Sequence, residues 1–117
     1  MKSELRVIVA AVVLAHSRQK QLSSIYSYSE SSHRNINVKA SGSTINAYDY
    51  STSSHVTGQL SNLYHHGIGS HFQLKPNGPN AYTGYDFDSG SHFAVQLNGV
   101  NVQIYDYEHA EYFNYSG

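Results

Sequence analysis

The phrase YDFDSGSH at residues 85–92 closely repeats YDYSTSSH at residues 48–55. Copies of this phrase follow one another at intervals of roughly 20 residues, the length of one supersecondary unit. Aligned on the leading tyrosine, the five copies begin at Tyr26, Tyr48, Tyr64, Tyr85 and Tyr105. The eighth position of the phrase is occupied in turn by His33, His55, His71, His92 and Tyr112. The repetition predicts a repeated unit of structure and by itself indicates no chemistry.

Each copy has the pattern of a β-hairpin, in which an extended stretch ends in aromatic residues and turn-forming Ser or Gly residues follow. We expect a loop of two or four residues centred on the fifth and sixth positions of the phrase, with the third position directly opposite the eighth. The predicted cross-strand pairs are Tyr28 with His33, Tyr50 with His55, His66 with His71, Phe87 with His92, and Tyr107 with Tyr112. The signals LNGV at 97–100 and ASGS at 40–43 predict further two-residue turns between hairpins.

Alternation of side chains sorts the strands into a core face and an outer face. The stretches VNVQIYDY and HFAVQL place Val100, Val102 and Ile104 on the core face, together with Phe93, Val95 and Leu97. At the rim of this face, next to the turns, the pattern places Asp49, Asp86 and Asp106, whose carboxylates can accept bonds from turn N–H groups. The tyrosines and the eighth-position histidines fall on the outer face.

The predicted fold is all-β. Residues 23–117 form five tandem hairpins in an antiparallel meander of ten strands. We expect the meander to close or nearly close into a barrel, because a flat sheet of that size would expose an apolar face and two unpaired edges to water. A barrel of this strand number has more interior than its own side chains fill. We therefore expect the apolar N-terminal segment, within residues 1–22, to supply an eleventh strand or a plug for the core.

Residues 1–22 also have a second interpretation. Lys2 and Arg6 precede an apolar run from Val7 to Ala15, and this order is typical of a secretory signal peptide that is removed. Glu4 and the shortness of the run are less typical of one. The run also falls short of the ~20 residues that cross a bilayer, so the sequence predicts no transmembrane anchor and leaves the compartment open.

The YDYxxxxH copies and the ending VQIYDYEHAEYFNYSG resemble short uncharacterised bacterial proteins made of tandem YDY hairpins. More loosely, the short aromatic hairpins are similar to the β-flower families. The resemblance covers about residues 24–117, and it implies an all-β repeat fold without assigning any catalytic or binding residue. The first copy departs from the pattern at Ser27, and the third departs at His65 and His66.

Composition excludes several classes of partner. Only 13% of the residues are charged and the net charge is −1, so a nucleic acid is not an expected partner. The absence of cysteine excludes disulfides and thiolate metal sites. Four Ser-His neighbours, among them Ser54 with His55, suggest a hydrolase, but adjacent strand residues point to opposite faces. We expect a non-enzymatic protein.

Two binding hypotheses remain. The outer face offers tyrosines and histidines that could contact a protein, mediate self-association or stack on a glycan, or could merely stiffen the sheet. The candidate residues are Tyr28, Tyr48, Tyr50, Tyr85, Phe87, Tyr105, Tyr107, His33, His55 and His92. Alternatively, His66 and His71 could form a cross-strand pair that binds Zn or Ni, with a third imidazole from His55 or His92.

Overall fold

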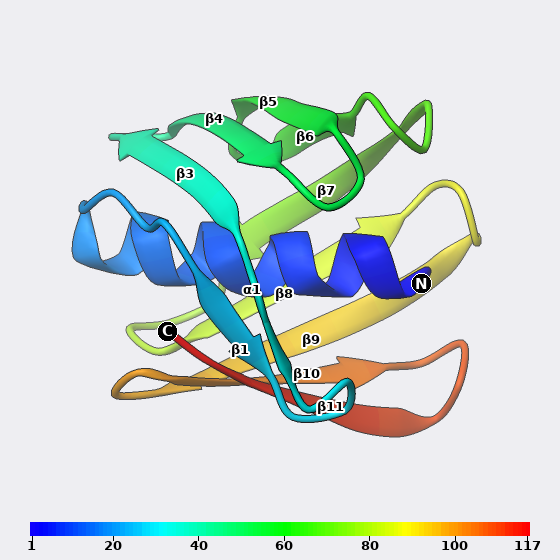
Figure 1. Ribbon diagram of the computed structural model, residues 1–117. Helices are drawn as coiled ribbons and strands as arrows, with labels where there is room; N and C mark the ends of the chain where they lie inside the picture. The colour runs from blue at the N-terminus through cyan, green and yellow to red at the C-terminus, as the bar shows by residue number, and fades with distance from the viewer.

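The computed structural model describes residues 1–117 and consists of one helix and eleven antiparallel strands in a single sheet (Figure 1). The helix is α1 (Ser3–Arg18). The strands are β1 (Ile25–Ser27), β2 (Ser32–Arg34), β3 (Ile36–Ser41), β4 (Thr44–Asp49), β5 (Ser54–Gln59), β6 (Asn62–His65), β7 (Ser70–Pro76), β8 (Ala81–Asp86), β9 (Ser91–Asn98), β10 (Asn101–Asp106) and β11 (Glu111–Ser116). The predicted all-β hairpin meander is confirmed.

The sheet closes almost completely into a barrel. From one edge to the other, its order is β2, β1, β11, β10, β9, β8, β7, β6, β5, β4, β3. The two edge strands, β2 and β3, are consecutive in the chain and are separated only by Asn35. The seam is bridged further by Leu22, which exchanges two backbone hydrogen bonds with Val38 of 3.0 and 2.8 Å.

The eleventh strand has a different origin from the predicted one. The second strand of the first hairpin is interrupted at Asn35, so that it forms β2 on one side of the seam and β3 on the other. Residues 5–14 contribute no strand, because they lie within α1. The break in one strand therefore brings the two edges of the sheet together and nearly closes the barrel, and the N-terminal segment remains free to occupy the interior.

Helix α1 is the plug of the core. It crosses the middle of the barrel with strands around it (Figure 1), and every residue from Val7 to Ala15 is buried. A helix that is apolar all round is stable only where its whole circumference is enclosed. Within a barrel it also satisfies its own backbone N–H and C=O groups, for which the closed sheet offers no partners. The 16-residue α1 falls short of the length and hydropathy needed to cross a bilayer, and the chain has no other helix.

The C-terminal end of α1 is fastened to the barrel. Gln19 ends the helix in a left-handed conformation, and its side chain exchanges hydrogen bonds with the backbone of Gly42 in the β3–β4 turn. Arg18 donates to the carbonyl of Gly99 in the β9–β10 turn. His16 Nδ1 lies 2.6 Å from the hydroxyl of Tyr82 on β8. These contacts fix the helix along the barrel axis.

The register of the repeated hairpins differs from the predicted one by two residues on the first strand. The first position of the phrase, not the third, lies opposite the eighth, as in Tyr48 with His55 and Tyr85 with His92. Positions three to six form a four-residue loop. The sixth position has a positive φ in every copy, and Ser31, Ser53 and Ala110 adopt it without being glycine. The pairs predicted between positions three and eight are therefore wrong.

All five second-position side chains point inward and accept a hydrogen bond from a backbone N–H of the turn. The carboxylates of Asp49, Asp86 and Asp106 each accept one at 3.0 Å from the residue two positions later. In the other two copies Ser27 Oγ and His65 Nδ1 accept a bond from the residue three positions later, at 3.3 and 3.1 Å. The predicted turn-capping role of the aspartates is confirmed, and Ser27 and His65 take the same role.

The predicted core face is confirmed with one exception. Val102, Ile104, Phe93, Val95 and Leu97 are buried. Val100 lies with Gly99 in the β9–β10 turn and is 42% exposed, because the turn begins one residue later than the LNGV signal suggests. The ASGS signal is shifted in the same way, so that Gly42 and Ser43 form the β3–β4 turn.

Candidate functional site

Each repeated hairpin carries three rings on its outer face, which we call an aromatic trio. The leading tyrosine is packed by the third-position ring and by the eighth-position ring, with ring centroids 4.6–5.0 Å apart and mostly T-shaped. The trios are Tyr26/Tyr28/His33, Tyr48/Tyr50/His55, Tyr64/His66/His71, Tyr85/Phe87/His92 and Tyr105/Tyr107/Tyr112. Edge-to-face contact is a favourable arrangement of aromatic rings.

The members of a trio differ in exposure. The leading tyrosine is half-buried in every copy, whereas the third-position ring reaches into solvent from the turn. Tyr28, Tyr50, Phe87 and Tyr107 are 52–58% exposed, and Tyr112 is 62% exposed. Since all five turns lie at the same end of the barrel, the trios form a belt around that end. Large apolar side chains exposed in this number mark a candidate contact surface.

The belt contains every residue of the predicted outer face. Tyr48, Tyr85 and Tyr105 are leading rings, Tyr28, Tyr50, Phe87 and Tyr107 are turn rings, and His33, His55 and His92 are eighth-position rings. The prediction omitted Tyr26, Tyr64 and Tyr112. Their places in the aligned phrase are the signal that could have found them.

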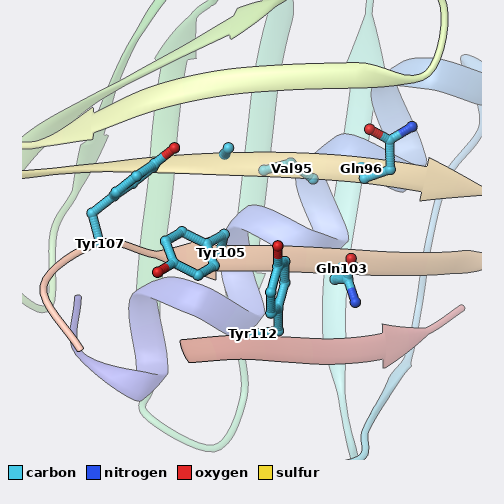
Figure 2. Close-up of a pocket in the computed structure, with 7 residues that line it drawn as sticks. Val95, Gln96, Gln103, Tyr105, Tyr107 and Tyr112 are labelled. Carbon is cyan, nitrogen blue, oxygen red and sulfur yellow. The ribbon is translucent and has the colours of Figure 1, made fainter. Parts of the chain in front are cut away.

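A groove lies on the outer face over β9, β10 and β11 (Figure 2). Its lining consists of Ala94, Val95, Gln96, Gln103, Tyr105, Tyr107 and Tyr112. Ala94 lies directly across the ladder from Tyr105, and Gln96 lies directly across from Gln103. The hollow follows from this pairing, since the short Ala94 side chain leaves the space beside the tyrosines open. Ala94 and Gln96 were not among the predicted site residues, although the alternation in HFAVQL is the signal that places them on the outer face.

The predicted metal-binding pair is not a cross-strand pair. His71 lies opposite Tyr64, whereas His66 belongs to the turn. Both imidazoles pack on the ring of Tyr64, and His66 Nε2 is 3.0 Å from the hydroxyl of Thr57. The correction follows from the register of the hairpin, which moves the third position into the loop.

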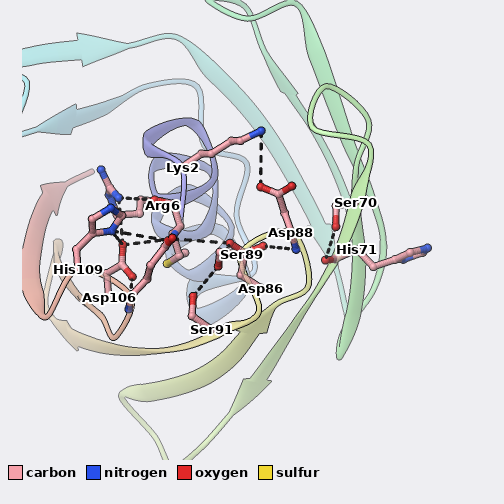
Figure 3. A network of polar contacts seen from close by, with 12 residues as sticks. Lys2, Arg6, Ser70, His71, Asp86, Asp88, Ser89, Ser91, Asp106 and His109 are labelled. Carbon is pink, nitrogen blue, oxygen red and sulfur yellow. Dashed lines mark hydrogen bonds and ion pairs between the residues drawn. The ribbon is translucent and has the colours of Figure 1, made fainter.

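The inner side of the same turns forms a charged cluster around the start of α1 (Figure 3). The α-ammonium of Met1 contacts Glu108 and lies 3.4 Å from Asp106 and 3.9 Å from Asp86. Arg6 donates to Asp106 at 3.1 Å and to the carbonyl of Met1, and its guanidinium stacks 3.8 Å above the ring of Phe113. The positive end of the helix dipole faces these carboxylates, which is a favourable arrangement.

Asp106 is the centre of this cluster and is fully buried. Burial raises its pKa, but the hydrogen bond with His109 and the Met1 ammonium outweigh that effect and lower the pKa below its ordinary value. Asp106, Glu108 and His109 offer ligand atoms within 4.8 Å of one another. Protein cations, Met1 and Arg6, already pair with two of these groups. We therefore assign this cluster a structural role.

In the third hairpin, His65 occupies the second position of the phrase, where three other hairpins have aspartate, and its side chain is 1% exposed. Burial lowers its pKa below the ordinary value of 6.5, and Glu4 and Asp49 oppose this only in part. Nδ1 accepts the hydrogen bond from Ile68, so the proton of the neutral ring lies on Nε2. Nε2 is buried without a partner.

Searches against models of protein families, curated proteins and solved structures find no match for this chain. The resemblance to tandem YDY hairpin proteins therefore stays a prediction.

Proposed function

We propose that this protein is a non-enzymatic structural or binding module that uses the belt of aromatic trios as its contact surface. The observation that supports this proposal is the exposure of Tyr28, Tyr50, Phe87, Tyr107 and Tyr112 on otherwise well-packed hairpins. Tyrosine is enriched at the centres of protein interfaces because its ring is apolar and its hydroxyl forms hydrogen bonds. The partner is another protein, a second copy of the chain, or a glycan.

The packing within each trio favours binding. A ring such as Tyr50 rests on Tyr48, which is itself packed by His55. A side chain held in one position loses less conformational entropy when a partner binds. The barrel and its helix hold the backbone beneath the rings, so the belt presents its rings in a fixed pattern.

Repetition supports a non-enzymatic role. Catalysis requires one place where a nucleophile, a base and a stabilising group converge. The phrase instead produces five similar trios, distributed around the barrel. Ser54 and His55 illustrate the point, because Ser54 is buried and faces inward whereas His55 is exposed on the outer face.

The test compares the untagged full-length chain with a variant in which Tyr28, Tyr50, Phe87 and Tyr107 are replaced by Ser. Sedimentation equilibrium reports self-association, and an array of neutral glycans reports sugar binding. We expect the native chain to associate or bind, and the variant to lose that property at unchanged secondary structure. A matched control replaces the exposed polar residues Asn46, Gln59 and Thr83 by Ser. The proposal fails if the native chain does neither, or if the belt variant behaves like the control.

Metal binding by His66 and His71 stays a prediction. The measurement is the zinc and nickel content of untagged protein, compared with His71→Ala. Stoichiometric metal that is lost in the variant would support it, and metal-free native protein of unchanged stability after chelation would contradict it.

A further inference from the structure

The fifth hairpin differs from the other four in the surroundings of its trio. It alone has tyrosine at the eighth position, so that Tyr105, Tyr107 and Tyr112 bring three phenol rings together. On the neighbouring strand, the leading tyrosines of the first four copies face Ser116, Asn37, Thr57 and Gln73, all of them polar. Tyr105 faces Ala94. Ala94 is the one apolar residue among these five, so the groove beside Tyr105 has an apolar wall.

Beside the tyrosines, three carboxamides form a row across three strands. Gln103 on β10 pairs with Gln96 on β9 and with Asn114 on β11, and all three are exposed on the outer face. Figure 2 shows Gln103 beside the ring of Tyr112, and Gln96 on the neighbouring strand β9, farther from the tyrosines. A carboxamide donates and accepts hydrogen bonds at once. The groove therefore combines aromatic rings with groups of both hydrogen-bonding kinds.

The groove has no charge of its own. Its seven lining residues include no Asp, Glu, Lys, Arg or His. An anionic ligand would find no cation here, and a cationic ligand would find no carboxylate. The complementary ligand is neutral, has an apolar face to lie on a ring, and carries hydroxyl groups at its edge.

We propose that this groove binds one sugar ring of a neutral oligosaccharide. The C–H face of the ring packs on Tyr105 and Tyr112, and Gln96 and Gln103 exchange hydrogen bonds with the ring hydroxyls. Tyr107 borders the site at the turn. This inference rests on the proposed function, because it assigns one partner class to one section of the belt.

A proline-rich peptide is the main competitor, since such peptides also bind aromatic grooves. Proline lacks a backbone N–H and offers only carbonyl acceptors. The acceptor oxygens of Gln96 and Gln103 would then remain without a donor. Binding by strand addition is excluded at this place, because β9, β10 and β11 are already paired on both sides. A sugar ring, which donates and accepts from each hydroxyl, matches the row of carboxamides.

The experiment is an NMR titration of the full chain with two uncharged probes, the β-1,4-linked tetrasaccharides of glucose and of N-acetylglucosamine, up to millimolar concentration. We expect shifts at the amides of Ala94, Gln96, Gln103 and Tyr112. Tyr112→Ala and Gln103→Ala should each weaken binding by about tenfold. Gln59→Ala is the matched control for Gln103→Ala, because it removes an exposed carboxamide from β5, outside the belt and the groove. It should leave the affinity unchanged.

If Tyr112→Ala fails to fold, Tyr112→His tests the same position, since histidine occupies this position in the other four hairpins. It should fold and still bind more weakly. The proposal is overturned if neither probe shifts these amides, if Gln59→Ala weakens binding equally, or if a decaproline peptide shifts the same amides at lower concentration. Should sugars fail while the belt still mediates self-association, the proposed function stands and this inference falls. Both fall when neither is observed.

Discussion

The inner and outer sides of the repeated turns obey different rules. On the inner side, the second position is filled by Ser27, His65 or an aspartate, three chemically different residues. On the outer side, a leading tyrosine packed by two rings recurs in all five copies. The inner position requires only an acceptor for a turn N–H, whereas each outer position of the trio is occupied by an aromatic ring.

The second-position side chains on the inner side also differ in charge and in the partner that balances it. Asp49 pairs with Arg34 at 3.0 Å, and Asp106 pairs with Arg6 at 3.1 Å. Asp86 has the more distant Met1 ammonium and accepts a bond from Ser89 at 2.7 Å. Ser27 and His65 accept their bonds as neutral groups and need no cation. A buried carboxylate is tolerated here where the fold supplies its partner.

The largest expected effect comes from removing helix α1, which supports the inner and the outer side of the turns. Deletion of residues 1–18 takes away the helix, including the nine consecutive buried residues Val7 to Ala15. Each large buried side chain contributes about 2–5 kcal/mol, so the loss exceeds the ~5–15 kcal/mol that stabilises a typical domain. We expect the truncated chain to be unfolded or aggregated by circular dichroism and gel filtration. A well-folded truncation would show that the barrel does not need its plug.

Asp106→Ala should give the next largest loss. It removes a turn cap and leaves Arg6 and the Met1 ammonium without their buried partner, which costs about 3–5 kcal/mol. Ser27→Ala is the matched control, because it removes a neutral cap from the same position of the phrase, at a cost of about 1 kcal/mol. Urea unfolding of both variants measures the difference. Equal losses would mean that the charge of Asp106 adds nothing beyond its role as a cap.

His65→Asp introduces a carboxylate of the kind found in the other hairpins, but without a cation. His65 lies near Glu4 and Asp49, so the new charge would be buried among like charges. We expect a loss of about 2–3 kcal/mol at neutral pH. His65→Asn, which keeps a neutral acceptor, should lose about half of that or less. If the two variants are equally stable, the division of inner positions by charge is wrong.

Some of this could be predicted from the sequence. Alternation in HFAVQL and VNVQIYDY identified the core residues, among them Val95 and Ile104, and the aspartate caps followed from turn chemistry. The register of the hairpins could not be predicted in this way. Ser31, Ser53 and Ala110 adopt a left-handed backbone conformation, which a sequence indicates only where it has glycine. The opposition of Ala94 and Tyr105 depends instead on the turn at Gly99 and Val100, which begins one residue later than the LNGV signal suggests.

The helix illustrates another limit. Its apolar run is rich in valine, which favours strands over helices when considered residue by residue. The enclosed position decides the outcome, because a segment inside a closed barrel must satisfy its own backbone. Enclosure is a property of the whole fold and leaves no local mark on residues 7–15.

Acidification should act on the inner side through His65. Its folded-state pKa is lowered, so the unfolded chain binds more protons near pH 6.5 and below, and stability falls as the pH falls through that range. Protonation of Nδ1 would also end its hydrogen bond with Ile68. We expect the melting temperature of the native chain to fall between neutral pH and about pH 5. The fall should be smaller in His65→Asn, with His16 responsible for the remainder because burial lowers its pKa in the same direction. Identical slopes in the two proteins would remove His65 as the cause.

The smallest expected effect on stability lies on the outer side. Tyr107→Ser removes a ring that is 58% exposed and contacts the leading Tyr105. One such aromatic contact contributes about 0.5–1.5 kcal/mol, and exposure places this one at the lower end. Tyr50→Ser, with the same exposed fraction, serves as its match in another hairpin. Urea unfolding should show losses well below that of Asp106→Ala. A loss as large as that of Asp106→Ala would mean that the rings hold the turns together, and the recurrence of the trios would then be explained by folding. A small loss leaves that recurrence unexplained by stability and favours a role in contact with a partner.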